Sequence, residues 1–187
     1  MPWWNEEDVI ETDVDYAVQL LEESGWEDTD GDGIREKDGE KLAFNLMYFA
    51  GDSMRQAVAM SVANQAKENM GFDITVEGVS ADDTIKRMFS EPMIMGWGSD
   101  SPMTSYMLFD SSNAGKTDFY NPEFYTNEKT DEYLEKAMSS LSIEDSYEWW
   151  KKAQWDGETG TCMRGEAPWA FYVNMTHLYY VKDGLNI

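Results

Sequence analysis

The stretch that decides the fold is LAFNLMYF (residues 42–49), which alternates in the manner of a strand but carries apolar side chains on both faces. This pattern predicts an inner strand of a sheet. Gly51-Asp52-Ser53 then breaks the strand and supplies a cap for a helix over residues 54–70, which Gly71 ends. A second alternating run, FDITVE (72–77), follows directly. Strand, helix and strand in this order predict a parallel βαβ unit.

A second short apolar run, MIMGWGSDSP (residues 93–102), is too short for a helix and stops at Gly-Trp-Gly. We interpret residues 93–97 as a buried strand that delivers Trp97 and Asp100 to its carboxyl end. In open α/β sheets, ligands bind at that end of the strands. The alternative is a core strand followed by a polar turn.

The remaining pattern predicts helices separated by turns, with two closing strands. A polar stretch over residues 110–127 is long enough to indicate a functional or mobile loop. No repeat and no linker divides the chain, so we expect a single domain over residues 1–187. The expected helices cover residues 13–24, 81–90, 103–109, 128–140 and 144–162, and the closing strands cover 168–173 and 178–181.

The composition excludes several classes of function. A formal net charge of -23 would repel the phosphates of nucleic acid and anionic lipid headgroups. Cys162 and His177 are the only residues of their types, so neither an internal disulfide nor a histidine-rich metal site is possible. The sequence holds no coherent catalytic set, and we expect no enzyme. It shows no apolar run of about 18 residues and no signal peptide.

An acidic loop precedes the first strand. Alternate aspartates followed by glycine match the first half of an EF-hand calcium loop: Asp28, Asp30, Asp32 and Gly33. The Ile34 carbonyl and the Glu36 carboxylate can complete the coordination of a cation. The twelfth position, however, is Gly39 rather than a glutamate. The loop is therefore either a weak calcium site or a turn whose aspartates bond to their own backbone.

Several motifs together resemble the carboxyl-terminal part of family 5 extracellular solute-binding proteins, the peptide, dipeptide and nickel receptors of ABC importers. The resemblance extends from about residue 13 to the end of the chain. Phe89-Ser90-Glu91-Pro92-Met93 departs from the family's usual Gly-Asp lead-in to the strand. The motifs are AVQLLEESGW (17–26), DTDGDGIREKDGEKLAF (28–44), GWGSDSP (96–102), NPEF (121–124) with Asp131, and WKKAQ (150–154).

This resemblance implies an α/β fold, one lobe of a type II periplasmic-binding protein, with a central mixed sheet and helices on both faces. It implies non-catalytic capture of a solute, most readily a peptide, between this lobe and a missing amino-terminal lobe, for delivery to an ABC permease. It also implies an extracellular or periplasmic location with a lipoprotein anchor.

The resemblance also assigns residues to the binding site. Asp100 would pair with the peptide's amino-terminal ammonium, Trp97 would form a pocket wall, and Gly98 and Ser99 would complete the ligand site. His177 lies near the position where nickel-binding members present a histidine, so a nickel or metal-complex receptor of the same family is the alternative.

Overall fold

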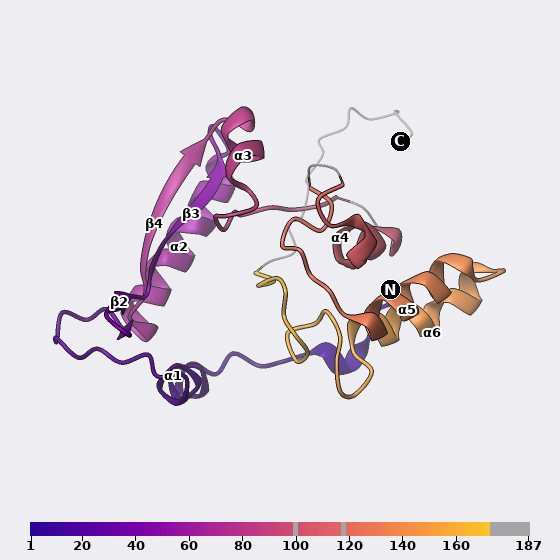
Figure 1. Cartoon of the computed structure of the whole chain (residues 1–187), viewed down its shortest axis with the longest axis horizontal. Coiled ribbons are helices and arrows are strands. Elements are labelled where there is room, and N and C mark those ends of the chain that lie inside the picture. The colour runs from indigo at the N-terminus through magenta and orange to yellow at the C-terminus, as the bar shows by residue number, and fades with distance from the viewer. Residues whose placement is uncertain (99–100, 117–118, 173–187) are drawn as a thin grey trace, which may run out of the picture.

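The strand–helix–strand unit predicted around residues 42–77 forms the left part of the molecule in Figure 1. Strand β3 (Ala43–Phe49) pairs in parallel with β4 (Asp73–Val79), and Leu46 lies opposite Val76 in the register. Helix α2 (Ser53–Met70) connects the two strands and lies against them. The βαβ prediction is therefore confirmed.

The structure is a computed structural model that describes residues 1–98, 101–116 and 119–172. Among these residues, no helix combines the length and hydrophobicity needed to cross a lipid bilayer. The other helices and strands are η1 (Glu6–Asp8), α1 (Val14–Glu23), β1 (Glu36–Lys37), β2 (Glu40–Lys41), α3 (Ala81–Arg87), α4 (Met103–Phe109), η2 (Ser111–Asn113), α5 (Glu128–Ser139) and α6 (Ile143–Gln154).

Helix α2 begins and ends where its sequence signals place it. The Asp52 carboxylate accepts a hydrogen bond from the Arg55 backbone N–H at 2.9 Å, which satisfies one of the free donors of the first turn. Gly71 ends the helix in the left-handed conformation with φ of 72°. The same glycine's carbonyl accepts the Arg35 N–H at 2.9 Å, so the acidic loop is attached to this end of the helix.

The face of the strand pair that α2 covers holds the first of two apolar cores, which we call the first cluster. Because strand side chains alternate, residues 44, 46 and 48 of β3 share this face. The cluster consists of the buried residues Leu46, Ala59 and Ile94, surrounded by Phe44, Tyr48, Val58, Val62, Ile74 and Val76.

The expected strand over residues 93–97 is wrong in extent. The Met47 N–H donates to the Pro92 carbonyl at 2.9 Å and the Ile94 N–H donates to the Met47 carbonyl at 2.8 Å, which makes a single parallel bridge. Pro92 has no N–H with which to begin a longer ladder. After Ile94 the chain leaves the sheet, because Trp97 packs elsewhere.

The central mixed sheet is therefore smaller than expected. In the described part of the chain, β3 and β4 form one two-stranded sheet, and β1 and β2 form a separate antiparallel hairpin. Helix α2 covers one face of the β3–β4 pair, and Arg87 at the end of α3 reaches Glu77 on the opposite face.

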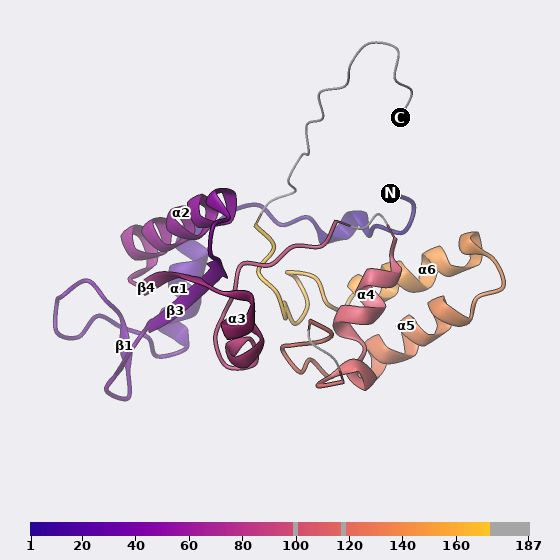
Figure 2. The ribbon, with the colours of Figure 1, turned by 90° about the horizontal axis from the view of Figure 1, so that it is seen from above.

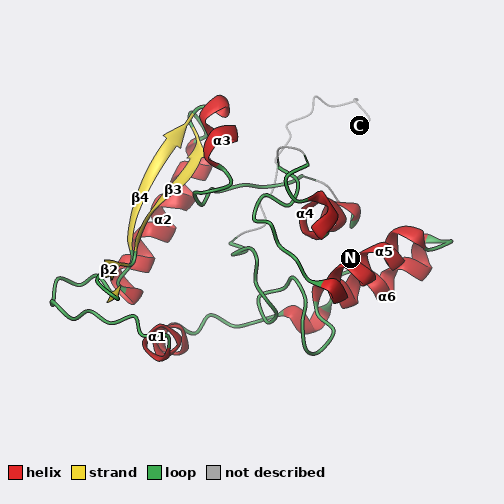
Figure 3. Cartoon of the chain, in the orientation of Figure 1, coloured by secondary structure: helices red, strands yellow, loops and turns green. Residues whose placement is uncertain are grey.

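The second part of the molecule, on the right of Figure 3, is built from helices and loops. It encloses what we call the second cluster, and α5 packs along α6. The buried members of this cluster are Leu108, Phe109, Tyr125, Leu134, Ala137, Trp150 and Ala153, with Trp97 and Trp169 among the partly buried aromatics around them.

Two other predictions in this part need correction. Helix α6 ends at Gln154 rather than at residue 162, because the Asp156 carboxylate accepts the N–H groups of Glu158 and Thr159, both at 2.9 Å, and turns the chain. Residues 168–172 form no strand. The rest of the closing strands, 173 and 178–181, lies outside the described residues.

Two chain segments connect the two parts, as both Figure 1 and Figure 2 show. One is the stretch before α1. It follows an amino-terminal segment that Asn5 attaches to α6 by hydrogen bonds to the carbonyls of Lys151 (3.1 Å) and Trp155 (2.8 Å). The other is the segment between α3 and α4, which contains Ile94 and Trp97.

Gly71 offers a test of the contact between the acidic loop and α2. A Cβ at Gly71 would lie 3.0 Å from Arg35 Cγ and 3.2 Å from the Gly33 carbonyl oxygen, whereas a Cβ at Gly51 would meet nothing within 4 Å. Both glycines have positive φ. We expect Gly51→Ala to lower the free energy of unfolding by about 1–2 kcal/mol, and Gly71→Ala by about 1 kcal/mol more, as measured by urea denaturation. Equal losses would show that the contact contributes nothing.

Candidate functional site

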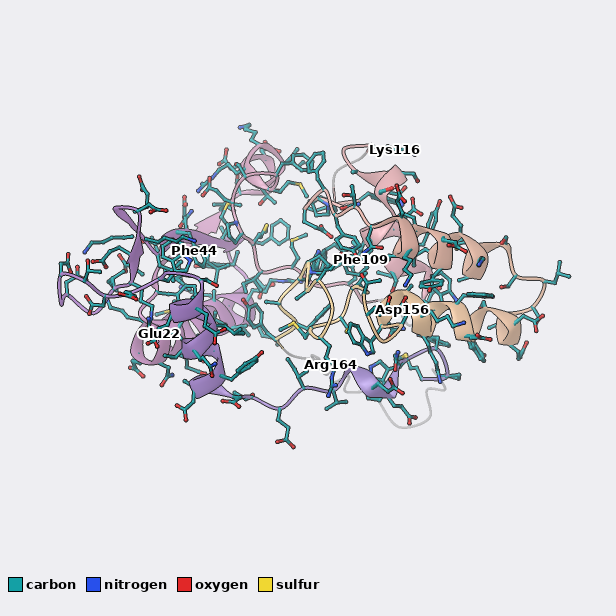
Figure 4. The ribbon with its side chains drawn as sticks, turned by 60° about the horizontal axis from the view of Figure 1, so that its bottom comes forward. Glu22, Phe44, Phe109, Lys116, Asp156 and Arg164 are labelled. Atoms are coloured by element: carbon teal, nitrogen blue, oxygen red, sulfur yellow. The ribbon has the colours of Figure 1, made fainter. Side chains whose placement is uncertain are left out.

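The segment that links the two parts also joins their apolar cores. Ile94 is buried in the first cluster. Three residues later, Trp97 packs against the second cluster, where its ring lies 4.6 Å from that of Trp169, centroid to centroid. Figure 4 labels Phe44 of the first cluster and Phe109 of the second, which lie in the two parts of the ribbon. The segment therefore crosses from one core to the other.

A mostly apolar cavity of about 460 Å³ lies along this crossing segment. Leu46 and Ile94 line it from the first cluster, and Trp97 and Trp169 line it from the second. Apolar cavities of this size with a few polar groups are the usual form of small-ligand sites. The boundary between the two cores is therefore the candidate site.

Glu123, in the loop before α5, is one of the residues that line this cavity. Both carboxylate oxygens are shielded from solvent, and neither has a partner at hydrogen-bond geometry within the part of the chain that the structure describes. Burial raises the pKa of the Glu123 carboxyl, and its own backbone N–H and the Trp169 indole oppose that shift only in part.

Asn121 fixes the loop that carries Glu123. Its side chain is fully buried, accepts the Tyr125 N–H at 2.7 Å and donates to the carbonyls of Asp110 (3.1 Å) and Tyr125 (2.8 Å). Its backbone has φ of 38°, a region that asparagine tolerates better than most residues. The part of this loop around Asn121 is thus held by buried hydrogen bonds rather than by secondary structure.

A charged network borders the cavity at Glu91. The Arg87 guanidinium donates to Glu91 at 2.6 and 2.7 Å and to Glu77 at 2.7 and 3.1 Å. Asn45 donates to both carboxylates. The bonds from Arg87 lower the pKa of Glu91 to about 2. Glu91 is therefore ionised, and both of its carboxylate oxygens accept hydrogen bonds from Arg87 or Asn45.

The structure places only part of the predicted ligand site. Trp97 lines the cavity and Gly98 is exposed beside it. Ser99 and Asp100 lie outside the described residues, as does His177. Sequence reasoning missed Glu123 and Trp169. The signals available for Glu123 were its place in NPEF (121–124) and the unusual length of the polar loop.

The acidic loop brings together three of its four predicted metal ligands. One oxygen each from Asp28, Asp30 and Glu36 lie within 4.8 Å of one another. Asp32 instead accepts the Ile34 N–H at 2.9 Å and pairs with Lys41, which lowers the pKa of Asp32.

Backbone N–H groups of the loop already donate hydrogen bonds to the carboxylates of Asp28 and Glu36. Asp28 accepts the N–H groups of Gly31 (2.7 Å) and Gly33 (2.9 Å), and Glu36 Oε1 accepts those of Thr29 (2.9 Å) and Asp30 (3.1 Å). This is the arrangement expected of the turn. One atom supports the calcium site instead, since Glu36 Oε2 is shielded from solvent and unpartnered among the described residues.

Comparison with known proteins places this geometry in a family. Residues 1–119 match the model described as bacterial extracellular solute-binding proteins, family 5 middle. The chain belongs to this family of solute-binding proteins. The predicted family is thereby confirmed, and it is a family of non-catalytic binding proteins.

Two relatives show how much of a family 5 protein this chain represents. It is 29% identical to protein XP55 of Streptomyces lividans over 184 residues, which cover 97% of this chain and 32% of the relative. It is 33% identical to the oligopeptide-binding protein AppA of Bacillus subtilis over 128 residues, or 66% of this chain and 23% of the relative. The chain therefore spans a third or less of these curated relatives.

The solved structures agree on the fold. AppA of Bacillus subtilis in complex with a nonapeptide superimposes with a TM-score of 0.68 at 29% identity, covering 76% of this chain and 29% of that one. NikZ of Campylobacter jejuni in complex with Ni(L-His) gives a TM-score of 0.65 at 24% identity, covering 76% and 29%. The second likeness concerns the fold alone.

The role of Asn121 can be measured by substitution. We expect Asn121→Ala to lower the free energy of unfolding by about 2–4 kcal/mol, because the buried Tyr125 N–H and two carbonyls lose their partner. Asn113→Ala removes one partly buried bond to the Tyr106 carbonyl (2.9 Å) and should cost about 1 kcal/mol. Urea denaturation of both variants checks this. Similar losses would mean that the loop does not depend on Asn121.

Proposed function

We propose that this chain is the ligand-binding lobe of a solute receptor that serves an ABC importer, and that the solute is a peptide. The observation that supports this most directly is the apolar cavity beside Trp97, within the GWGSDSP motif (96–102) of the family. The relative AppA, 29% identical in the aligned structure, is known in complex with a nonapeptide. Side chains of a peptide are of the size that such a cavity accepts.

In this proposal Asp100 binds the ammonium group at the peptide's amino terminus. A carboxylate and an ammonium form a charge-assisted hydrogen bond that strengthens when a closing cleft excludes water. Trp97 forms the adjacent wall, and Gly98 and Ser99 contribute backbone and hydroxyl groups near the ligand.

The rest of the receptor completes the site. An amino-terminal lobe supplies the opposite wall of the cleft, so the isolated lobe binds only weakly. The closed receptor delivers its peptide to a membrane permease from an extracellular or periplasmic position, held there by a lipoprotein anchor.

A peptide is favoured over a nickel complex because the chain has few histidine or cysteine side chains to coordinate nickel. His177 is the sole histidine of the sequence, so this chain offers at most one imidazole to a metal. The similarity to NikZ, at 24% identity, supports the shared fold and no more.

The ammonium contact predicts a specific loss of affinity. In the receptor that contains this chain, Asp100→Ala should weaken binding of a free tripeptide about tenfold to a hundredfold, because one charge-assisted bond is lost. Isothermal titration calorimetry measures the change.

Two controls make that result specific. The amino-acetylated tripeptide has no ammonium and should bind both forms equally. Asp145→Ala, at the start of α6, should leave all affinities unchanged. Unchanged affinity for the free tripeptide in Asp100→Ala would remove Asp100 from the site.

Calcium binding by the acidic loop is a second proposed function, carried by the convergence of Asp28, Asp30 and Glu36 and by the unpartnered Glu36 Oε2. The ammonium group of Lys41, which lies 3.4 Å from Asp30 Oδ2, competes for the same carboxylates. The site is therefore proposed to be weak.

Calcium should stabilise the chain if it binds only the folded loop. We expect millimolar calcium to raise the melting temperature of the chain relative to EDTA, and Asp28→Asn to abolish the increase. Asp82→Asn, on α3, serves as the control that keeps it. Differential scanning calorimetry that shows no calcium-dependent shift would reject the site.

A further inference from the structure

Glu123 lines the cavity, and neither of its carboxylate oxygens has a partner at hydrogen-bond geometry among the described residues, although its own backbone N–H and the Trp169 indole lie close enough to oppose the rise of its pKa. Burying a carboxylate without a full set of hydrogen bonds raises the free energy of the folded state, and such groups are rare in folded proteins. The elevated pKa of Glu123 has the same physical origin, which is desolvation. The fold therefore places an unsatisfied acid beside an apolar space of about 460 Å³.

The position of Glu123 is imposed by the surrounding structure. Asn121, two residues earlier, is fixed by three hydrogen bonds, and Tyr125, two residues later, is buried in the second cluster. The backbone on both sides is thus held. The side chain itself has three rotatable bonds, so its carboxylate can turn toward the cavity that it lines without a backbone movement.

The other acidic residue lining the cavity behaves differently. Glu91 is paired with Arg87 and accepts a further hydrogen bond from Asn45 at 2.9 Å. Among the described lining residues, Glu123 is therefore the acid whose charge is not already matched by a neighbouring cation.

We propose that the cavity binds a basic side chain of the peptide, an ammonium or guanidinium group on an apolar stem, with Glu123 as its counter-ion. This inference rests on the proposed function, which it deepens by naming the class of peptide. It adds a second, separate charge contact to the one proposed for Asp100.

The walls of the cavity suit the stem of such a side chain. Ile94, Met95 and Pro122 offer apolar surface to methylene groups, which lysine and arginine commonly bury while their charged heads remain paired. Trp97 and Trp169 offer two indole faces that attract a cation. The net charge of -23 further raises the local concentration of basic peptides around the protein.

In this proposal Asp100 and Glu123 bind two different groups of one ligand. Asp100 follows Trp97 by three residues, a length of chain that spans at most about 11 Å. A peptide whose amino terminus is bound at Asp100 would therefore place a side chain of one of its first residues within reach of the cavity beside Trp97.

The experiment compares tripeptides that differ only in the charge of one side chain. Calorimetry on the receptor that contains this chain would use Lys-Ala-Ala, Ala-Lys-Ala and Ala-Ala-Lys, each against the same peptide with norleucine in place of lysine. At one position we expect lysine to bind about tenfold to a hundredfold more tightly than norleucine. Glu123→Gln should abolish that preference, while Glu135→Gln, an exposed position on α5, should preserve it.

The outcomes separate this inference from the proposed function. Peptides that bind without any lysine preference, or a preference that survives in Glu123→Gln, would overturn the role of Glu123 and leave the peptide receptor intact. A preference lost in Asp100→Ala as well as in Glu123→Gln would also overturn it, because the two contacts would not be separate.

A second readout covers the case in which no peptide binds. Tryptophan fluorescence of the receptor that contains this chain would be titrated with 4-phenylbutylamine and with its neutral counterpart, 4-phenylbutanol. Binding of the amine that is stronger than that of the alcohol, and that Glu123→Gln removes, would support the cation site even though the peptide function had failed. Equal binding of the two, or binding of neither, would overturn the inference.

Discussion

The two hydrogen bonds that Met47 makes with the Pro92–Ile94 segment are the constraint on which the described architecture depends. They attach the crossing segment to the centre of β3, and Met47 itself is fully buried at that point. The bridge is short because Pro92 has no N–H to donate to a longer ladder and because Trp97 packs against the second cluster. A longer strand would carry Trp97 along the sheet and would close the space between the two clusters.

The space between the clusters is kept open by polar interactions rather than by apolar packing alone. Asn121 satisfies the backbone of a loop that has no regular secondary structure, as buried backbone groups require. Arg87 forms ion pairs with both Glu77 and Glu91 at the border of the cavity. Glu123 departs from this pattern with both of its carboxylate oxygens, and it lies at the site where a ligand is proposed to bind.

Carboxylates of the acidic loop are likewise paired with groups close to them in the sequence. In the acidic loop and the hairpin of β1 and β2, Asp28 and Glu36 accept hydrogen bonds from backbone N–H groups, and Lys41 pairs with Asp32. Most of these contacts are exposed and contribute little to stability individually. Their effect is to define the shape of the loop, and Gly71 then attaches that loop to the end of α2.

Local signals in the sequence determined the elements and the family. The cap at Asp52, the left-handed glycine at Gly71 and the alternation of residues 42–49 each act over a few residues, so the βαβ unit was predictable. The site was not, because Glu123 and Trp169 join Trp97 at the cavity from distant parts of the chain and follow no periodic pattern. Only the tertiary structure decided that the strand at 93–97 would shorten to one bridge, since that outcome depends on competition between two cores for the same segment.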